Sequence, residues 1–328
     1  MTELPHRRAG HAPARLLPLL LLLVTLVCTA ATACTGPGTA ASAEAAPAAR
    51  ESGHAAAVLT NDATALRQRW QLFGASQILT QRCMRDRGLR FLVTSAGPRP
   101  PAGATTAESI GSRSAPGYGV STALGGMNNG PTAQDRYVRS LSATARTRYS
   151  AALDGPAGRS APLTLPSGAS GTYATGGCTA RARAELYGTV RAALEDTLVP
   201  QDVDQLLQRY LATDPAYQKA LGRWQRCLAD AGRPAKTPAA LIESLRAEAV
   251  RGASASKLAR EQRAAATADQ HCDGVSGLRR TGADRRAVFL RQQPARTRAR
   301  LEEVWQHRRQ ALTRAAVLLG QDGRGSLG

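Results

Sequence analysis

The chain has 328 residues, which is enough for one large domain or two medium ones with a buried core. Aromatic residues account for only 4%, which excludes a core built on rings, so burial must come mainly from Leu, Ala and Val. The formal net charge of +19 favours anionic partners such as phospholipid headgroups or cell-wall polymers, although a GC-rich genome also produces a strong arginine bias.

Residues 1–33 predict a signal peptide for export. Arg7, Arg8 and Arg15 form a positively charged region, and an apolar run from Leu16 to Val27 follows it. This run is too short to span a bilayer comfortably, so we expect a cleaved signal and not an anchor helix. The pair Arg7-Arg8 leaves twin-arginine export as an alternative route. Export makes nucleic acid an unexpected partner.

The apolar run leads to Cys34, which we predict to be a lipidated N-terminus. Small residues at Ala31 and Ala33 suit a signal peptidase, although Ala31 stands where a lipobox usually has Leu. The alternative is ordinary cleavage near Ala33 or Ala43, which would release a secreted protein. Residues 34–54 are rich in Ala, Ser and Pro and predict a flexible tether, because they cannot bury enough apolar area to offset their ordering entropy.

Helical periodicity dominates the rest of the chain and suggests two helical halves, at 55–198 and 201–320, with a disordered tail at 321–328. In the first half we expect long Gly- and Pro-rich loops, a short strand at 89–93 and helices at 61–87, 132–153 and 178–199, the last stopped by Pro200. In the second half we expect helices starting near Asp202, Pro215, Pro238, Ser256 and Asp284, the last kinked at Pro294 and capped by Gly320.

One motif occurs twice, at Gln81–Gly88 and Gln225–Gly232, with Gln, Arg, Cys, Asp and Gly in the same order and spacing. Each copy reads as a helix end closed by a glycine in the left-handed conformation. Each is followed by one later cysteine, so an exported chain favours two disulfides among Cys83, Cys178, Cys227 and Cys272. The repeat favours pairing 83 with 178 and 227 with 272, and crossed pairings remain an alternative. No Cys-x-x-Cys pair is present, so no metal site is expected.

The Gly-rich segment after residue 95 contains Tyr118 between two glycines, with Ser121 and Thr122 close behind. A loop this long is often functional, so we name Tyr118, Ser121 and Thr122 as candidate ligand contacts. The alternative is that Tyr118 packs back onto the helices. No catalytic motif is present, so no catalytic residue and no cofactor are assigned. We expect acid pairs such as Asp202 with Asp204 to lie on solvated helix faces and not to form a hydrolytic pair.

Five groups of residues stand out along the chain: Cys83-Met84 with Gly88-Leu89 and Phe91, Gly117-Tyr118-Gly119-Val120-Ser121-Thr122, Gly176-Gly177-Cys178, Trp224 with Cys227-Leu228 and Ala231-Gly232, and Asp269 with Cys272. Together they resemble a group of uncharacterised actinobacterial secreted proteins and lipoproteins. The resemblance covers most of the chain after Cys34, with Phe91 standing where such proteins often have Tyr, and it implies no activity for any position.

These features predict a mainly helical, disulfide-stapled bundle of two pseudo-repeated halves. We expect an extracytoplasmic lipoprotein on the outer face of the cell membrane, acting by binding or scaffolding. Its expected partners are the membrane, through the lipid anchor, and an anionic wall polymer or another envelope protein. One alternative is a hydrolase of cell-wall polymer. The other is a basic module that binds anionic wall polymer or lipid headgroups through the Arg-rich face at 279–314.

Overall fold

The computed structural model describes residues 53–60, 63–93, 118, 120 and 131–325. In this part of the chain the fold is mainly helical, as predicted, with one two-stranded sheet. A short helical segment covers residues 53–59. The other elements are α2 (Ala63–Asp86), α4 (Ala133–Ser140), α5 (Ala143–Asp154), β1 (Ser160–Thr164), β2 (Ser170–Ala174), α6 (Gly177–Tyr187), α7 (Val190–Thr213), α8 (Pro215–Asp230), α9 (Pro238–Val250), α10 (Ala255–Ser276), α11 (Leu278–Gln292) and α12 (Ala295–Gly325).

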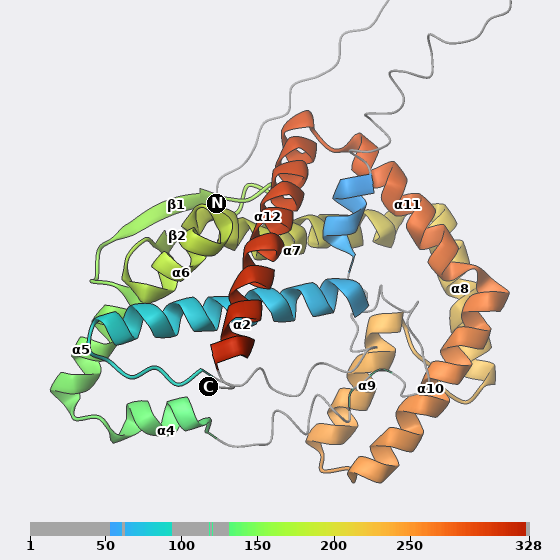
Figure 1. The fold of residues 1–328 in the computed structure, drawn as a ribbon. Coiled ribbons are helices and arrows are strands. Elements are labelled where there is room, and N and C mark those ends of the chain that lie inside the picture. Colours follow the sequence, from blue (N-terminus) through green and yellow to red (C-terminus); the bar gives the residue numbers. More distant parts are fainter. Residues whose placement is uncertain (1–52, 61–62, 94–117, 119, 121–130, 326–328) are drawn as a thin grey trace, which may run out of the picture.

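The helices form two lobes joined by a central layer (Figure 1). One lobe holds α4, α5, α6 and the hairpin, and the other holds α8, α9, α10 and α11. In the central layer α12 packs against α2, α6 and α7, so the last helix of the second predicted half lies against the first half. The predicted boundary between the halves, at residues 199–200, falls inside α7.

Each lobe has its own disulfide within its own apolar cluster. Cys83 bonds to Cys178 and Cys227 to Cys272, which confirms the pairing that the repeated motif favours. The first bond lies in a cluster with Met84 and Tyr149. The second lies in a larger cluster around Trp224, in which Trp224 and Cys272 are fully buried. Each staple therefore holds together elements that are distant in sequence.

The two copies of the repeated motif end their helices with the same hydrogen bonds. In the first, the amide of Leu89 donates to the carbonyl of Met84 over 2.9 Å, and Gly88 has a φ of 70°. In the second, the amide of Arg233 donates to the carbonyl of Leu228 over 2.8 Å, and Gly232 has a φ of 71°. Both are the Schellman closure that the glycines predict.

Pro200 does not end a helix, so that prediction is wrong. It lies inside α7, which continues to Thr213. Proline removes one helical hydrogen bond. Packing outweighs this loss, because Val199 and Val203 on either side are fully buried in the cluster that joins α7 to α11 and α12.

Other boundaries differ from the predictions because of local capping. The expected helix at 132–153 is two helices, since the Ser142 hydroxyl accepts from the amide of Ala145 and starts α5 anew. Pro294 separates α11 from α12, because a residue before proline avoids the helical region and Gln293 is extended.

Two further predictions are wrong. Residues 89–93 form no strand, and α12 does not end at Gly320 but continues through it. The hairpin of β1 and β2 was not predicted.

Four arginines of the basic stretch at 279–314 form ion pairs that tie helices together. Each carboxylate partner is buried and lies on, or at the edge of, a helix earlier in the chain. Much of the predicted basic face is therefore structural. The pairs are Arg279 with Asp273, Arg285 with Asp214, Arg300 with Glu195, and Arg308 with Asp196.

Candidate functional site: an apolar pocket with a cationic rim

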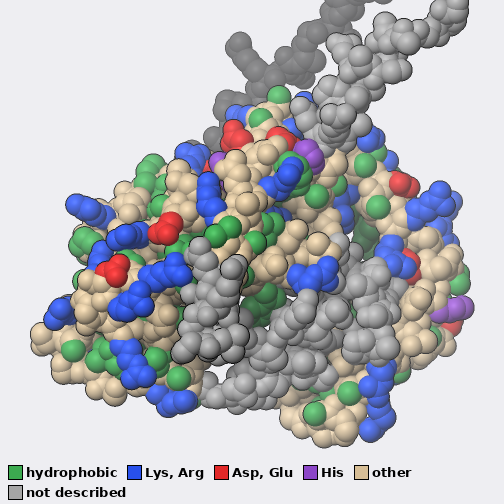
Figure 2. All heavy atoms as spheres, viewed as in Figure 1, with side chains coloured by type: hydrophobic (Ala, Val, Ile, Leu, Met, Phe, Trp, Pro, Cys, Tyr) green, Lys and Arg blue, Asp and Glu red, His purple; other side chains and the backbone are tan. Residues whose placement is uncertain are grey.

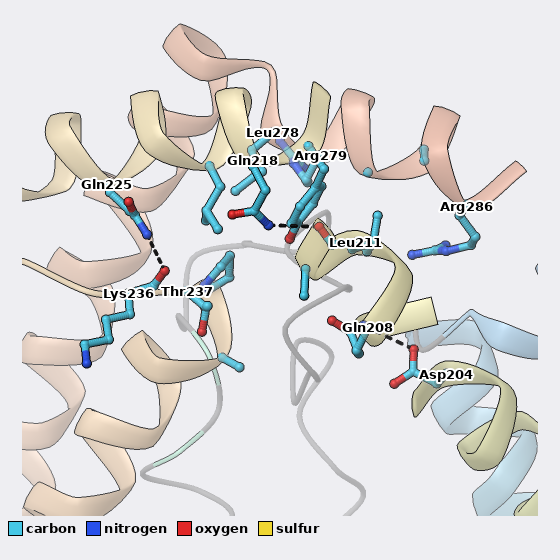
Figure 3. Close-up of a pocket in the computed structure, with 17 residues that line it drawn as sticks. Asp204, Gln208, Leu211, Gln218, Gln225, Lys236, Thr237, Leu278, Arg279 and Arg286 are labelled. Atoms are coloured by element: carbon cyan, nitrogen blue, oxygen red, sulfur yellow. Dashed lines mark hydrogen bonds between the residues drawn. The ribbon is translucent and has the colours of Figure 1, made fainter. Parts of the chain in front are cut away.

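A pocket in the described part of the chain has a volume of about 850 Å³. It lies where the central layer meets the second lobe, between the end of α7, the start of α8, residues 236–239 and one face of α11 (Figure 3). Ligand pockets for small molecules generally span about 300–1,000 Å³, so the volume suits a small-molecule ligand.

Apolar side chains form the walls of this pocket. Leu211 ends the α7 side, Leu221 faces from α8 and Leu278 begins the α11 side, and all three are buried. Tyr217 contributes its ring and Pro238 adds a rigid surface at the start of α9. These walls favour a ligand with a substantial apolar part.

One face of α11 gives the pocket its shape and much of its charge. Arg279, Gly282, Ala283 and Arg286 line it at the spacing i, i+3, i+4 and i+7, which places them on a single stripe of the helix. The two small residues leave space at the centre of the stripe. A Cβ at Gly282 would lie 3.5 Å from the Tyr217 ring, so a larger side chain there would enter the pocket.

Cations outnumber anions in the pocket lining. Lys236, Arg279 and Arg286 line it together with a single acid, Asp204. Lys236 is exposed, and Figure 3 shows it at the edge of the pocket. Arg279 also pairs with Asp273 through a contact of 2.6 Å. With Arg279 engaged by Asp273, Lys236 and Arg286 against Asp204 leave the lining one net positive charge, which favours a ligand with an acidic group.

Two side-chain amides fix the polar parts of the pocket wall. The Gln218 side chain donates to the carbonyl of Leu211 over 2.8 Å, and the Gln225 side chain donates to the carbonyl of Lys236 over 2.7 Å. These bonds join α7 to α8 and hold residues 236–239 against α8. Hydrogen bonds therefore hold together the elements that form the pocket.

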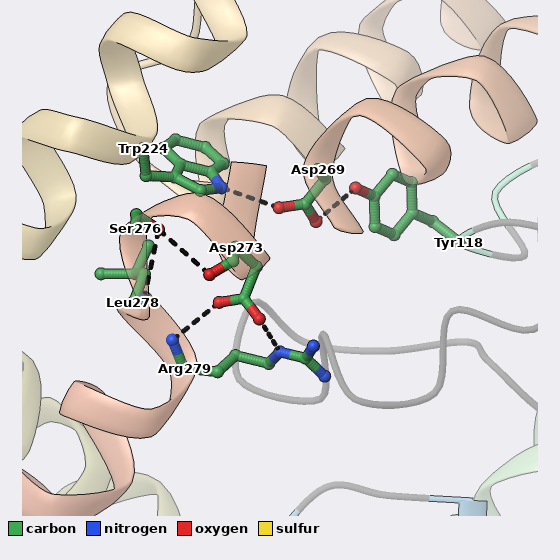
Figure 4. Close-up of polar contacts among 7 residues, drawn as sticks. All are labelled: Tyr118, Trp224, Asp269, Asp273, Ser276, Leu278 and Arg279. Atoms are coloured by element: carbon green, nitrogen blue, oxygen red, sulfur yellow. Dashed lines mark hydrogen bonds and ion pairs between the residues drawn. The ribbon is translucent and has the colours of Figure 1, made fainter. Parts of the chain in front are cut away.

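The candidate contact Tyr118 lies elsewhere, in the interior of the second lobe (Figure 4). It is only 3% exposed, and its hydroxyl donates to Asp269 over 2.7 Å. The indole of Trp224 donates to the other oxygen of Asp269 over 2.8 Å. This geometry matches the alternative in which the tyrosine packs onto the helices. Ser121 and Thr122 lie outside the described residues, as does Cys34.

The buried acids of the first lobe and central layer serve the fold through named partners. Asp202 accepts from the amide and the hydroxyl of Ser167 and so anchors the hairpin turn to α7. Asp196 accepts from Tyr187 and Arg308, and burial together with this carboxylate raises the pKa of Tyr187 far above its usual range. None of these acids lines the pocket.

Sequence reasoning missed the pocket residues. Their signal was the stripe on α11, in which small residues stand between two arginines at helical spacing. This signal is weak, because a glycine and an alanine inside a helix do not by themselves indicate a cavity.

No group of three or more His, Cys, Asp or Glu side chains is arranged to hold a metal ion within the described ranges. Among the helices of these ranges, none is both long enough and apolar enough to cross a membrane. Comparison of the chain with protein-family models, with curated proteins and with solved structures finds no match.

Proposed function

We propose that this protein is an extracytoplasmic binding lipoprotein whose pocket takes an amphipathic anion, a molecule with an apolar body and an acidic head. The observation that carries the proposal is the 850 Å³ pocket with leucine walls and three cations in its lining. An apolar pocket with a few polar groups is the usual form of a small-molecule site. A binding role also agrees with the partners of the buried acids described above, which serve the fold.

An extracytoplasmic location is supported by the two disulfides, because such bonds persist in oxidising compartments. Lipid attachment at Cys34 is part of the proposal and rests on the sequence alone. Radiolabelled palmitate should enter the wild-type protein and not a Cys34→Ala variant. Equal labelling of both would contradict this anchor.

The pocket is tested with Gly282→Leu in the full-length protein stripped of lipid. A leucine at this position would extend beside the Tyr217 ring and occupy the pocket. Helix propensity favours the change, since glycine is the worse helix former by about 0.5–1 kcal/mol. The probe is a fluorescent fatty acid, with its methyl ester as the uncharged partner.

We expect wild type to bind the fatty acid saturably and Gly282→Leu to bind it at least about tenfold more weakly, a loss of about 1.4 kcal/mol. The matched control is Gly274→Leu, a glycine of α10 with open space around its Cβ and no place in the pocket lining. This control should bind as wild type does. Equal binding by both variants would show that the ligand lies elsewhere.

The cationic rim is tested separately with Lys236→Gln. Because Lys236 is exposed, the change should leave folding intact. Binding of the fatty acid should weaken while binding of the methyl ester stays the same. Equal affinity of wild type for acid and ester would exclude a role for the cations.

A further inference from the structure

A second surface, separate from the pocket, is formed by exposed arginines in the first lobe. They lie at the end of α2, just after it, and on α4 and α5. Lys and Arg side chains outnumber Asp and Glu on the side of this lobe shown in Figure 2. We call these residues the arginine surface: Arg85, Arg87, Arg90, Arg136, Arg139, Arg146 and Arg148.

The segments that carry these arginines are held together by direct contacts. Arg87 donates to the carbonyl of Ala152 over 3.2 Å, which joins the end of α2 to α5. The guanidinium of Arg90 lies 5.9 Å from the centre of the Tyr137 ring on α4. The Cys83–Cys178 disulfide and its apolar cluster lie beneath them. These contacts connect the segments that carry the arginines.

None of the seven arginines forms an ion pair with a carboxylate of the described part of the chain. The nearby Asp135 is used as a helix cap, with its carboxylate accepting from the amide and the hydroxyl of Thr132. These hydrogen bonds lower the pKa of Asp135 and keep it committed to that role. The same segments also carry the exposed acids Asp86 and Asp154, so the seven arginines stand against three carboxylates and leave an excess of positive charge.

The arginines at 279–314 differ from those of the arginine surface in their ion pairs. There, four arginines pair with buried acids and act as ties between helices. Several residues of the arginine surface are also held in place, since Arg87, Arg136 and Arg146 donate to backbone carbonyls. A held guanidinium loses less entropy when it binds an anion.

We propose that the arginine surface binds an extended phosphodiester polymer of the cell wall. The guanidinium fork matches the two free oxygens of a phosphodiester, and several such groups on one lobe can contact successive phosphates of a repeating polyanion. Insertion into a membrane surface needs exposed apolar side chains, and attraction to lipid headgroups by charge alone is separated from polymer binding by the vesicle measurement below. The large apolar side chains exposed in the described residues are Phe73, Val250, Val275 and Val317, and none belongs to these segments.

The test measures binding of soluble poly(glycerol phosphate) to the full chain carrying Cys34→Ala, which removes the anchor. The variant is Arg85→Gln, Arg139→Gln, Arg148→Gln, chosen because these three side chains are exposed and tie no helices together. The matched control is Arg251→Gln, Arg260→Gln, Arg263→Gln, three exposed arginines of the other lobe. Both variants remove the same charge, so any difference between them is due to position.

We expect the first variant to bind the polymer at least about tenfold more weakly at low salt and the control to bind as the parent does. On a double-logarithmic plot of affinity against salt, the slope should fall by about 2, because each phosphate that the variant no longer neutralises removes roughly 0.7 on a single strand. Equal weakening in both variants would show attraction by net charge and overturn the proposal. Binding to phosphatidylglycerol vesicles without binding to the polymer would also overturn it.

Chemical protection of the arginines in the protein without these substitutions gives a test that does not depend on how well the variants fold. Phenylglyoxal modifies exposed arginines, and bound polymer should slow modification of Arg85, Arg139 and Arg148 but not of Arg251. Uniform rates at all four positions would contradict the proposal. This surface and the pocket are independent, so the failure of either leaves the other standing.

Discussion

The indole nitrogen of Trp224 donates to a carboxylate oxygen of Asp269 over 2.8 Å, and both side chains are almost fully buried. The hydroxyl of Tyr118 donates to the second oxygen of the same carboxylate. A residue of the Gly-rich loop is thereby fixed to α10, and α10 to α8. The carboxylate connects three segments that are distant in sequence.

Asp269→Asn should therefore destabilise the protein. The amide keeps the size of the side chain but presents only one acceptor to two donors, so one buried donor is left without a partner. We expect the free energy of unfolding to fall by about 2–3 kcal/mol, measured by urea denaturation. Trp224→Phe removes one donor, and a double-mutant cycle of the two changes should show coupling above about 0.5 kcal/mol. Additive effects would contradict this role.

Much of this fold was readable in the sequence because its signals are local. The repeated cysteine motif predicted the disulfide pairing, and Asp214-Pro215 and Thr237-Pro238 predicted helix starts that the structure confirms. The errors occurred where packing overrides a local signal, as at Pro200. The Trp224–Asp269 contact and the pocket were beyond reach, because both depend on which helices meet in space.

The two disulfides should contribute similar amounts to stability but affect different lobes. Replacing Cys227 and Cys272 by alanine opens a separation of 45 residues, and replacing Cys83 and Cys178 opens one of 95. In the chain-entropy model each change lowers the free energy of unfolding by about 4–5 kcal/mol. Only the first should alter the near-ultraviolet signal of Trp224, which lies in the cluster of that disulfide. A decrease below about 1 kcal/mol would argue against a structural staple.

The glycines that close the repeated motif should resist substitution. Gly232→Ala places a side chain at a φ of 71°, which costs about 1–2 kcal/mol, and Gly88→Ala should cost the same. The matched control is Gly222→Ala, a glycine inside α8, the helix that Gly232 closes. It has an ordinary φ, and its Cβ would meet only the flexible end of Arg226 at 3.8 Å. That change should stabilise the protein by up to about 1 kcal/mol, as thermal melting would show. Equal effects at positions 222 and 232 would contradict the cap.

The last prediction concerns acid sensitivity and rests on Asp214, which begins α8. Its carboxylate accepts from the amide of Tyr217 over 2.9 Å and from Arg285 over 2.7 Å. Burial works to raise the pKa of Asp214, but these partners outweigh it and hold the pKa below the ordinary value of 3.8. The folded state therefore binds the proton more weakly than the unfolded chain. The stability that this group contributes is complete above pH 3.8 and is lost as the pH falls through the lowered value.

Asp214→Asn isolates the charge, because asparagine remains a good helix cap. Wild type should be more stable than this variant near neutral pH, and the difference should shrink as the pH falls below about 4. Arg285→Gln removes one of the groups that lower the pKa of Asp214. The stability that this variant loses on acidification should therefore be smaller, and the loss should be complete at a higher pH, than in wild type. Urea midpoints measured between about pH 2 and pH 7 would show this. Parallel pH profiles for wild type and Asp214→Asn would mean that the carboxylate acts only as a neutral cap.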